Sequence, residues 1–130
     1  MALTPAMEDY LEAILMIKRQ HGYVRCVDVA EQLGVKKPSV SRAVKELSKS
    51  GHLVKNADGT LSLTKLGVQI AEQIYEKHQF FTRQLIEAGV PEDIAKEDAC
   101  KLEHVVSETT FSKLKETARS QNREVIASDE

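Results

Sequence analysis

Two groups of residues, far apart in the sequence, carry metal-binding side chains at spacings typical of a helix. Asp9 and Glu12 stand three residues apart, and Cys100, Glu103 and His104 stand at positions i, i+3 and i+4. These spacings place the members of each group on one face of a helix. Thiolate, carboxylate and imidazole together are ligands for Fe, Mn, Co or Zn, whereas Ca and Mg prefer oxygen ligands. The residue types therefore indicate a candidate site for a divalent transition metal.

Each group also has an ordinary structural explanation. Acids such as Asp9 and Glu12 favour the start of a helix because they complement its dipole. His78, which lies among apolar neighbours in a long helical segment, is on its own typical of a packed or solvated helix residue. Cys100 alone fits the role of a small buried apolar side chain. From the residues alone, the metal-binding and the structural interpretations of the cluster from Cys100 to His104 both stay open.

The N-terminal half of the sequence contains start and stop signals for three helices. Thr4 followed by Pro5 is typical of a helix start, because Thr caps the helix and Pro removes a donor that would lack a partner. The first helix is expected to end near His21 and Gly22, a short second helix to end at Gly34, and a third to run from Pro38 to Gly51. Two short helices around a Gly-containing turn, the second of them basic, predict a helix-turn-helix.

Two alternating segments, 53–55 and 60–63, flank an Asp-Gly turn and predict a small β-hairpin that completes a winged helix. The rest is expected to be helical, with helices starting at Thr64 and Pro91 and a last one over about 109–118. The predicted fold is mainly α: a winged-helix DNA-binding domain at 1–64, a helical metal-binding and dimerisation domain at 65–119 and a polar tail at 120–130. Because so small a helical domain leaves apolar surface uncovered, a homodimer is expected.

Charge is distributed unevenly, although the formal net charge is only −2. Residues 18–55 hold nine basic side chains against three acidic ones, a local charge of +6. On the third helix, Ser39, Arg42 and Lys45 recur every three residues opposite an apolar stripe, as in a helix that enters the major groove. The candidate DNA-binding residues are Lys36, Lys37, Pro38, Ser39, Ser41, Arg42, Lys45 and Lys55. A solvated basic helix is the ordinary alternative, but the winged-helix context favours DNA.

The composition argues against several other classes of protein. No segment approaches the roughly 20 apolar residues of a membrane span, and the N-terminal segment is acidic, so a cytoplasmic protein without a signal peptide is expected. Cys26 and Cys100 have no paired spacing, which predicts free thiols. Cys100 with His104 as a nucleophile and base would need an oxyanion-hole motif that the sequence lacks, so neither an enzyme nor a small-molecule substrate is expected.

Five short motifs and His78 carry a resemblance to a known family. The motifs are MEDYLE at 7–12, DVA at 28–30, PSVS at 38–41, LTKLG at 63–67 and DACKLEHVVS at 98–107. Over residues 5–115 the sequence resembles the diphtheria toxin repressor and manganese transport regulator family of metal-dependent bacterial repressors. The resemblance implies a regulatory metal site of Asp9, Cys100, Glu103 and His104, with Glu12 and His78 joining in the manganese-type arrangement of two metals.

The sequence departs from the family pattern in three places. Asp9 is the acid of the manganese branch and Cys100 is the thiol of the iron branch, so the implied site is a hybrid. The ancillary site of the iron branch is in doubt because Thr82 and Lys96 stand where it requires Glu and His. The C-terminal SH3-like domain of the iron branch is expected to be absent, which makes the chain a short form closer in architecture to the manganese regulators.

The resemblance implies a homodimeric repressor of metal-uptake genes that binds a palindromic operator in double-stranded DNA. Mn(II) or Fe(II) would be the co-repressor, and Zn(II) or Co(II) could bind in vitro. Two alternatives remain: a metal-independent winged-helix regulator whose acids and histidines are structural, and a small metalloenzyme. The choice between Mn and Fe, and between one and two metals per subunit, stays open.

Overall fold

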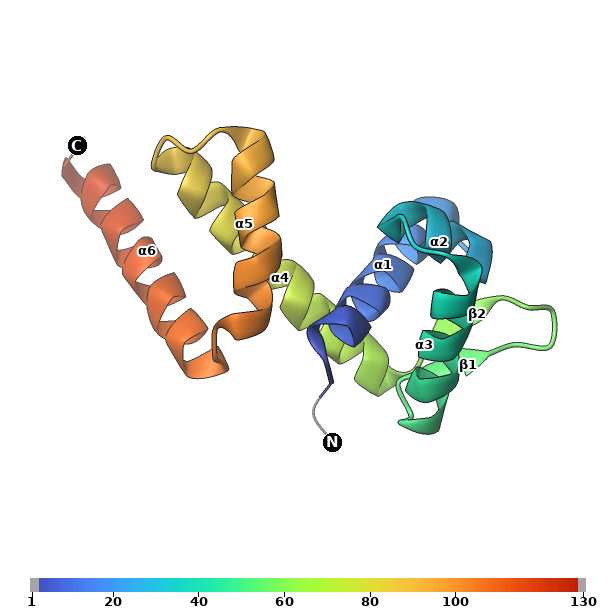
Figure 1. Ribbon diagram of the computed structural model, residues 1–130. Coiled ribbons are helices and arrows are strands. Elements are labelled where there is room, and N and C mark those ends of the chain that lie inside the picture. The colour runs from blue at the N-terminus through green and yellow to red at the C-terminus, as the bar shows by residue number, and fades with distance from the viewer. Residues whose placement is uncertain (1–2, 129–130) are drawn as a thin grey trace. The chain divides into compact units, whose positions relative to one another are not determined.

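The computed structural model describes residues 3–128, and their side chains over residues 3–121. Over this range the chain forms six helices and one two-stranded sheet (Figure 1). The elements are α1 Pro5–His21, α2 Cys26–Leu33, α3 Lys37–Lys49, β1 Leu53–Lys55, β2 Leu61–Leu63, α4 Lys65–Glu87, α5 Glu92–Val105 and α6 Glu108–Ser128. The predicted mainly α fold with a winged helix-turn-helix is confirmed. Within the described range, no helix combines the length and the apolar character needed to cross a membrane.

The chain divides into two compact units, Met1–Glu76 and Lys77–Glu130. The division falls inside α4, so the first half of this helix belongs to the winged-helix unit and the second half to the helical unit. Each unit therefore contains one half of α4 as part of its own packing.

The first two helices end where the sequence predicts, because their caps satisfy the backbone. At the start of α1, the N–H of Met7 donates a hydrogen bond of 3.2 Å to Oγ1 of Thr4. Gly22 and Gly34 follow α1 and α2 in the left-handed conformation, with φ of 85° and 66°. A side chain with a Cβ would be strained at these two positions. The caps therefore fix the lengths of both helices.

The core of the first unit is formed by one apolar face of each of its helices. On α3, Val40, Val44 and Leu47 are buried at the helical spacing that the sequence predicts. They belong to the same cluster as Leu11 and Ile14 of α1. Because the apolar stripe of α3 faces this core, the polar residues of α3 face solvent.

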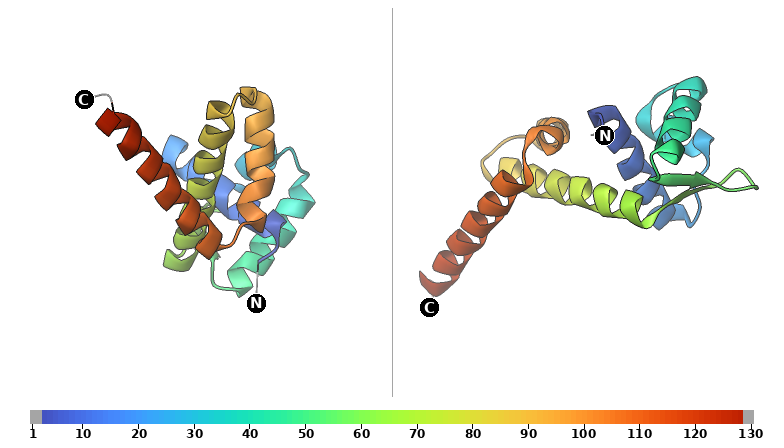
Figure 2. Two further views of the ribbon diagram at one scale, coloured as in Figure 1. Left: turned by 90° about the vertical axis from the view of Figure 1, so that its left-hand side faces the viewer. Right: turned by 90° about the horizontal axis from the view of Figure 1, so that it is seen from below.

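The hairpin of β1 and β2 projects away from the helices of the first unit (Figure 2). Its register pairs Leu53 with Leu63, Val54 with Ser62 and Lys55 with Leu61. Near its tip, the N–H and the hydroxyl of Thr60 donate to Oδ1 of Asp58 at 3.0 and 2.6 Å, and these bonds hold the pKa of the Asp58 carboxyl below its usual value. The Arg25 guanidinium donates to the carbonyl of Asp58 at 3.0 Å, which ties the hairpin to the start of α2.

The second unit is built around an aromatic cluster. In Figures 1 and 2, α5 runs back alongside the second half of α4. Phe80 and Phe81 of α4 meet Phe111 of α6, and the three ring centroids lie 5.3 to 6.1 Å apart. Phe111 is almost fully buried, and Ala99 of α5 packs in the same cluster. The cluster thus joins all three helices of this unit.

Several large apolar side chains of the second unit remain exposed. Ile86, Ile94, Val105 and Leu114 are 43%, 46%, 77% and 40% exposed. Ile94 and Val105 are apolar residues of α5, yet their side chains do not reach the core of a single chain. This finding agrees with the expectation that the helical domain leaves apolar surface uncovered.

The last helix is longer than the sequence predicts. A helix was expected over 109–118, whereas α6 extends from Glu108 to Ser128. No Gly or Pro occurs after Pro91, so no residue forces the helix to end near 118. The predicted helix end is therefore wrong. A separate polar tail at 120–130 stays a prediction, since residues 120–128 are helical and residues 129 and 130 lie outside the described range.

Gly67 lies where the start of α4 meets the backbone that follows α3. A Cβ atom at this position would overlap with the carbonyl oxygen of His52. The same oxygen accepts a hydrogen bond of 3.1 Å from the N–H of Thr64. The hydroxyl of Thr64 in turn accepts a bond of 3.2 Å from the N–H of Gly67, as expected of a helix cap. Glycine is required at position 67 because two backbone segments approach this closely.

Replacing Gly67 by Ala should therefore destabilise the protein by about 1 to 3 kcal/mol, because the added methyl group displaces a hydrogen-bonded backbone oxygen. Urea unfolding followed by circular dichroism measures the change. The control is Gln69→Ala on the exposed face of the same helix, which should change the free energy of unfolding by less than about 0.5 kcal/mol. Equal stability of the two variants would contradict the close approach.

Candidate metal centre and nucleic-acid face

Three metal-binding side chains converge in the C-terminal half of α5. Cys100, Glu103 and His104 each offer a donor atom that lies within 4.8 Å of the donor atoms of the other two. The side chains of Glu103 and His104 are 0% and 7% exposed, and Cys100 is half-buried. A sulfur, an oxygen and a nitrogen donor thus share a small volume that is largely closed to water.

Glu103 is completely buried, which is rare for a carboxylate. Its Oε2 lies 2.9 Å from Nδ1 of His78 on α4, and this contact is a hydrogen bond when Nδ1 carries the proton. Its Oε1 lies 3.5 Å from Nε2 of His104 and has no hydrogen-bond partner in the described part of the chain. A buried carboxylate oxygen that accepts no hydrogen bond raises the free energy of the folded protein. A cation beside Oε1 would offset that cost.

The donor set fits a divalent transition metal. Two donors that each lie about 2.1 Å from one ion stand roughly 3.0 to 3.4 Å apart at octahedral or tetrahedral angles. The 3.5 Å between Oε1 of Glu103 and Nε2 of His104 is close to that separation. The thiolate of Cys100 would add a soft ligand, which disfavours Ca²⁺ and Mg²⁺. The bond between Glu103 and His78 is of the kind that orients side chains around a metal.

Two further candidate ligands belong to the first unit, and the two positions of the ancillary site belong to the second. Asp9 and Glu12 are half-buried on α1, one turn apart, in the first unit. In the second unit, the buried hydroxyl of Thr82 has no hydrogen-bond partner among the described residues. Lys96 is exposed and pairs with Glu92 at 3.0 Å, and an ammonium group has no lone pair for a metal. Lys96 therefore cannot replace the histidine of an ancillary site.

All eight residues predicted to bind DNA are exposed. Lys36 precedes α3, six of the others lie on its first three turns, and Lys55 lies on β1. Because the opposite side of α3 is buried in the core, its cations and hydroxyls form one solvent-facing surface. This surface has the residue types that contact phosphates and base edges in DNA.

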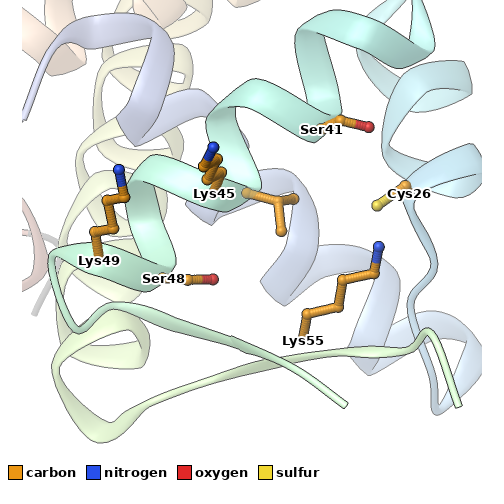
Figure 3. A pocket seen from close by; sticks show the side chains of 7 residues that line it. Cys26, Ser41, Lys45, Ser48, Lys49 and Lys55 are labelled. Atoms are coloured by element: carbon orange, nitrogen blue, oxygen red, sulfur yellow. The ribbon is translucent and has the colours of Figure 1, made fainter. Parts of the chain in front are cut away.

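A pocket of about 390 Å³ lies among α2, α3 and β1. It is lined by Cys26, Ser41, Val44, Lys45, Ser48, Lys49 and Lys55. In Figure 3, the Lys55 amine and the Ser41 hydroxyl extend toward the side of the pocket on which Cys26 lies. Ser41, Lys45 and Lys55 are among the residues predicted to bind DNA, and Lys49 belongs to the same basic segment at 18–55, where its side chain suits a phosphate. The cationic surface of α3 thus continues to the hairpin.

Two family descriptions match almost the whole chain. Residues 2–61 match the iron dependent repressor, N-terminal DNA binding domain, and residues 64–121 match the iron dependent repressor, metal binding and dimerisation domain. The HTH-type transcriptional regulator MntR of Lysinibacillus sphaericus is 32% identical over 111 residues, which cover 85% of this chain and 80% of that protein. An uncharacterized HTH-type transcriptional regulator of Methanocaldococcus jannaschii is 33% identical over 115 residues, 87% of this chain and 92% of that protein.

Solved structures show the same similarity. The manganese regulator SloR superposes with a TM-score of 0.80 at 30% identity, covering 90% of this chain and 55% of that chain. The metal-dependent transcriptional regulator MtsR superposes with a TM-score of 0.82 at 30% identity, with the same two coverages. The chain therefore spans about half the length of these two solved chains.

Replacing Glu103 by Gln should leave the metal-free protein equally stable or stabilise it by up to about 2 kcal/mol, because a neutral amide is less costly to bury than a carboxylate. Urea unfolding in the presence of a chelator measures the difference. Glu97→Gln, an exposed position on the same helix, is the control and should stay within about 0.5 kcal/mol of the original protein. A loss of more than about 2 kcal/mol in Glu103→Gln would show that the carboxylate is already well compensated without metal.

Proposed function

The chain belongs to the iron-dependent repressor family, and on that premise we propose that it represses transcription when a divalent metal binds at α5. Mn(II) or Fe(II) is the proposed co-repressor. The family's members are metal-dependent transcription regulators rather than enzymes. The observation that carries the proposal is the convergence of Cys100, Glu103 and His104 around a buried carboxylate oxygen that lacks a hydrogen-bond partner in the described chain.

The proposed ligands come from three helices, α1, α4 and α5. Cys100, Glu103 and His104 of α5 bind the ion together with Asp9 of α1. Glu12 and His78 are the further ligands in an arrangement of two metals. The assignment of Asp9, Glu12 and His78 is supported by their match to the family motifs in the sequence. Proximity in the second unit supports the assignment of the other three.

Electrostatic repulsion among the proposed ligands explains how a bound metal would change the binding of DNA. Asp9, Glu12, Glu103 and the thiolate of Cys100 repel one another, and the bound metal supplies the positive charge that reverses this repulsion. The apolar face of α1 packs in the same core as α3, the helix proposed to read DNA. Ligands on α1 and on α5 would thus couple the DNA-reading helix to the second unit. Metal binding then shifts a population toward the state that binds DNA and needs no chemical step.

Cys100 governs the choice between Mn(II) and Fe(II). A thiolate is a softer ligand than a carboxylate and favours Fe(II), whereas the oxygen donors of Asp9 and Glu103 suit Mn(II). This hybrid donor set supports both ions as co-repressors. Zn(II) and Co(II) would also bind in vitro, because affinity for such sites rises along the first transition row.

The proposed partners are double-stranded DNA and a second copy of the chain. The exposed Ile94, Val105 and Leu114, with the match to a dimerisation domain, support self-association of the second unit. In a two-fold dimer, two α3 helices reach half-sites about one DNA turn, roughly 34 Å, apart, which selects a palindromic operator. Arg42 is proposed to read guanine and the lysines to contact phosphates. Metal-uptake genes are the proposed targets.

Mn(II) or Fe(II) should raise the affinity for DNA by about tenfold or more, since coupling between two sites is typically about 5- to 150-fold. The probe is a duplex selected from a random pool by the metal-loaded protein, and gel shifts with metal or with chelator measure the response. Glu103→Ala should abolish the response while sedimentation shows an intact dimer, and Glu97→Ala should retain it. DNA affinity unchanged by chelator would instead favour a metal-independent winged-helix regulator.

Cys100→Glu should increase the preference for Mn(II) over Zn(II) by about tenfold, because a hard carboxylate replaces the soft thiolate. Competition titrations with the two ions measure the ratio of dissociation constants. With Co(II), the thiolate-to-metal absorption band of the original protein should disappear in Cys100→Glu and persist in Cys26→Ser. An unchanged ratio together with an unchanged band would remove Cys100 from the ligand set.

A further inference from the structure

Lys77 is buried in the second unit, next to the candidate metal ligand His78. Lys77 is only 7% exposed, and a lysine is seldom buried to this degree unless its charge is paired. Its Nζ donates to the carbonyl oxygen of Val106 at 3.2 Å and pairs with the Glu108 carboxylate at 2.7 Å. The same Nζ lies 5.9 Å from the centre of the Phe111 ring. The ammonium group is therefore bound to the connection between α5 and α6.

The contact with Val106 acts on the end of α5 that carries the metal donors. Val106 is the C-cap residue of α5, and helix ends carry carbonyl groups that need a partner from outside the helix. Glu103 lies one turn earlier on the same helix. Two consecutive residues of α4 thus hold α5 at two points, His78 at Oε2 of Glu103 and Lys77 at the carbonyl of Val106.

We propose that Lys77 is a positioning residue of the metal centre. By holding the carbonyl of Val106, Lys77 keeps the last turn of α5 wound and keeps Glu103 against His78, with Oε1 of Glu103 available to the ion. Lys77 is not itself a ligand, because its ammonium has no lone pair. The inference rests on the proposed function, since it takes the cluster on α5 as the place where the metal binds.

The direction in which a substitution of Lys77 changes the affinity for the metal separates positioning from simple electrostatics. Lys77 places a positive charge near the site, and removing that charge would strengthen the binding of a divalent cation if Coulomb repulsion were its only influence. Loss of positioning weakens the binding, because the ion must then order the end of α5 as it binds. A substitution that removes the charge and the hydrogen bond together therefore gives opposite results in the two cases.

The test is Mn(II) binding to Lys77→Met, measured from the electron paramagnetic resonance signal of free Mn(II) and by calorimetry. We expect an affinity about 10- to 100-fold lower, the range typical for partners that orient metal ligands. Lys77→Arg keeps the charge and the donors and should recover most of the affinity. The control is Lys101→Met, an exposed lysine of α5 that pairs with Glu97, which removes the same charge without touching the end of the helix.

A Lys77→Met variant that binds Mn(II) as tightly as Lys101→Met, or more tightly, overturns the proposal. If circular dichroism shows that Lys77→Met does not fold, Lys77→Gln is tested instead. Gln is polar but shorter than Lys and neutral, so this variant also loses the ion pair with Glu108. Weaker binding than in Lys101→Gln then supports the positioning role, and equal or tighter binding overturns it. Failure of the original protein to bind Mn(II) would instead contradict the proposed function, so the two failures can be told apart.

Discussion

The complete burial of the Glu103 carboxylate is the constraint on which the second unit depends. A charge taken out of water needs partners, and the chain supplies His78 to one oxygen and leaves the other facing His104. The aromatic cluster of Phe80, Phe81 and Phe111 holds the helices that make this burial possible. Among the described residues, Oε1 of Glu103 has no hydrogen-bond partner, and the proposed divalent cation is a partner that would offset this cost.

Much of the first unit follows from local signals. Thr4 and the glycines after α1 and α2 act on the backbone of their own helix ends, and the stripe through Val40, Val44 and Leu47 follows from helical periodicity. The cluster on α5 was visible for the same reason, because one turn of helix suffices to bring Cys100 and Glu103 together. Local rules thus predict which residues share a face and where most helices begin and end.

These local rules do not predict contacts between segments that are distant in the sequence. The ion pair of Lys77 with Glu108 joins residues far apart in sequence, and the clash that requires Gly67 involves a loop fifteen residues earlier. Neither position carries a periodic or capping signal. The end of α6 differs from the prediction for another reason: the segment after residue 118 is polar but has no helix breaker, and polarity alone does not end a helix.

The attachment of the hairpin to Arg25 affects how much backbone entropy the hairpin loses when it binds DNA. An isolated two-stranded hairpin is at best marginally stable in water, and these strands have only three residues each. The bonds from Arg25 and Thr60 to Asp58 order the tip before any partner arrives. A preorganised wing loses little backbone freedom when it meets a duplex, so more of the energy of the contact proposed for Lys55 would remain as affinity. Bonds within the protein, from Arg25 and Thr60 to Asp58, can in this way contribute to the affinity for DNA.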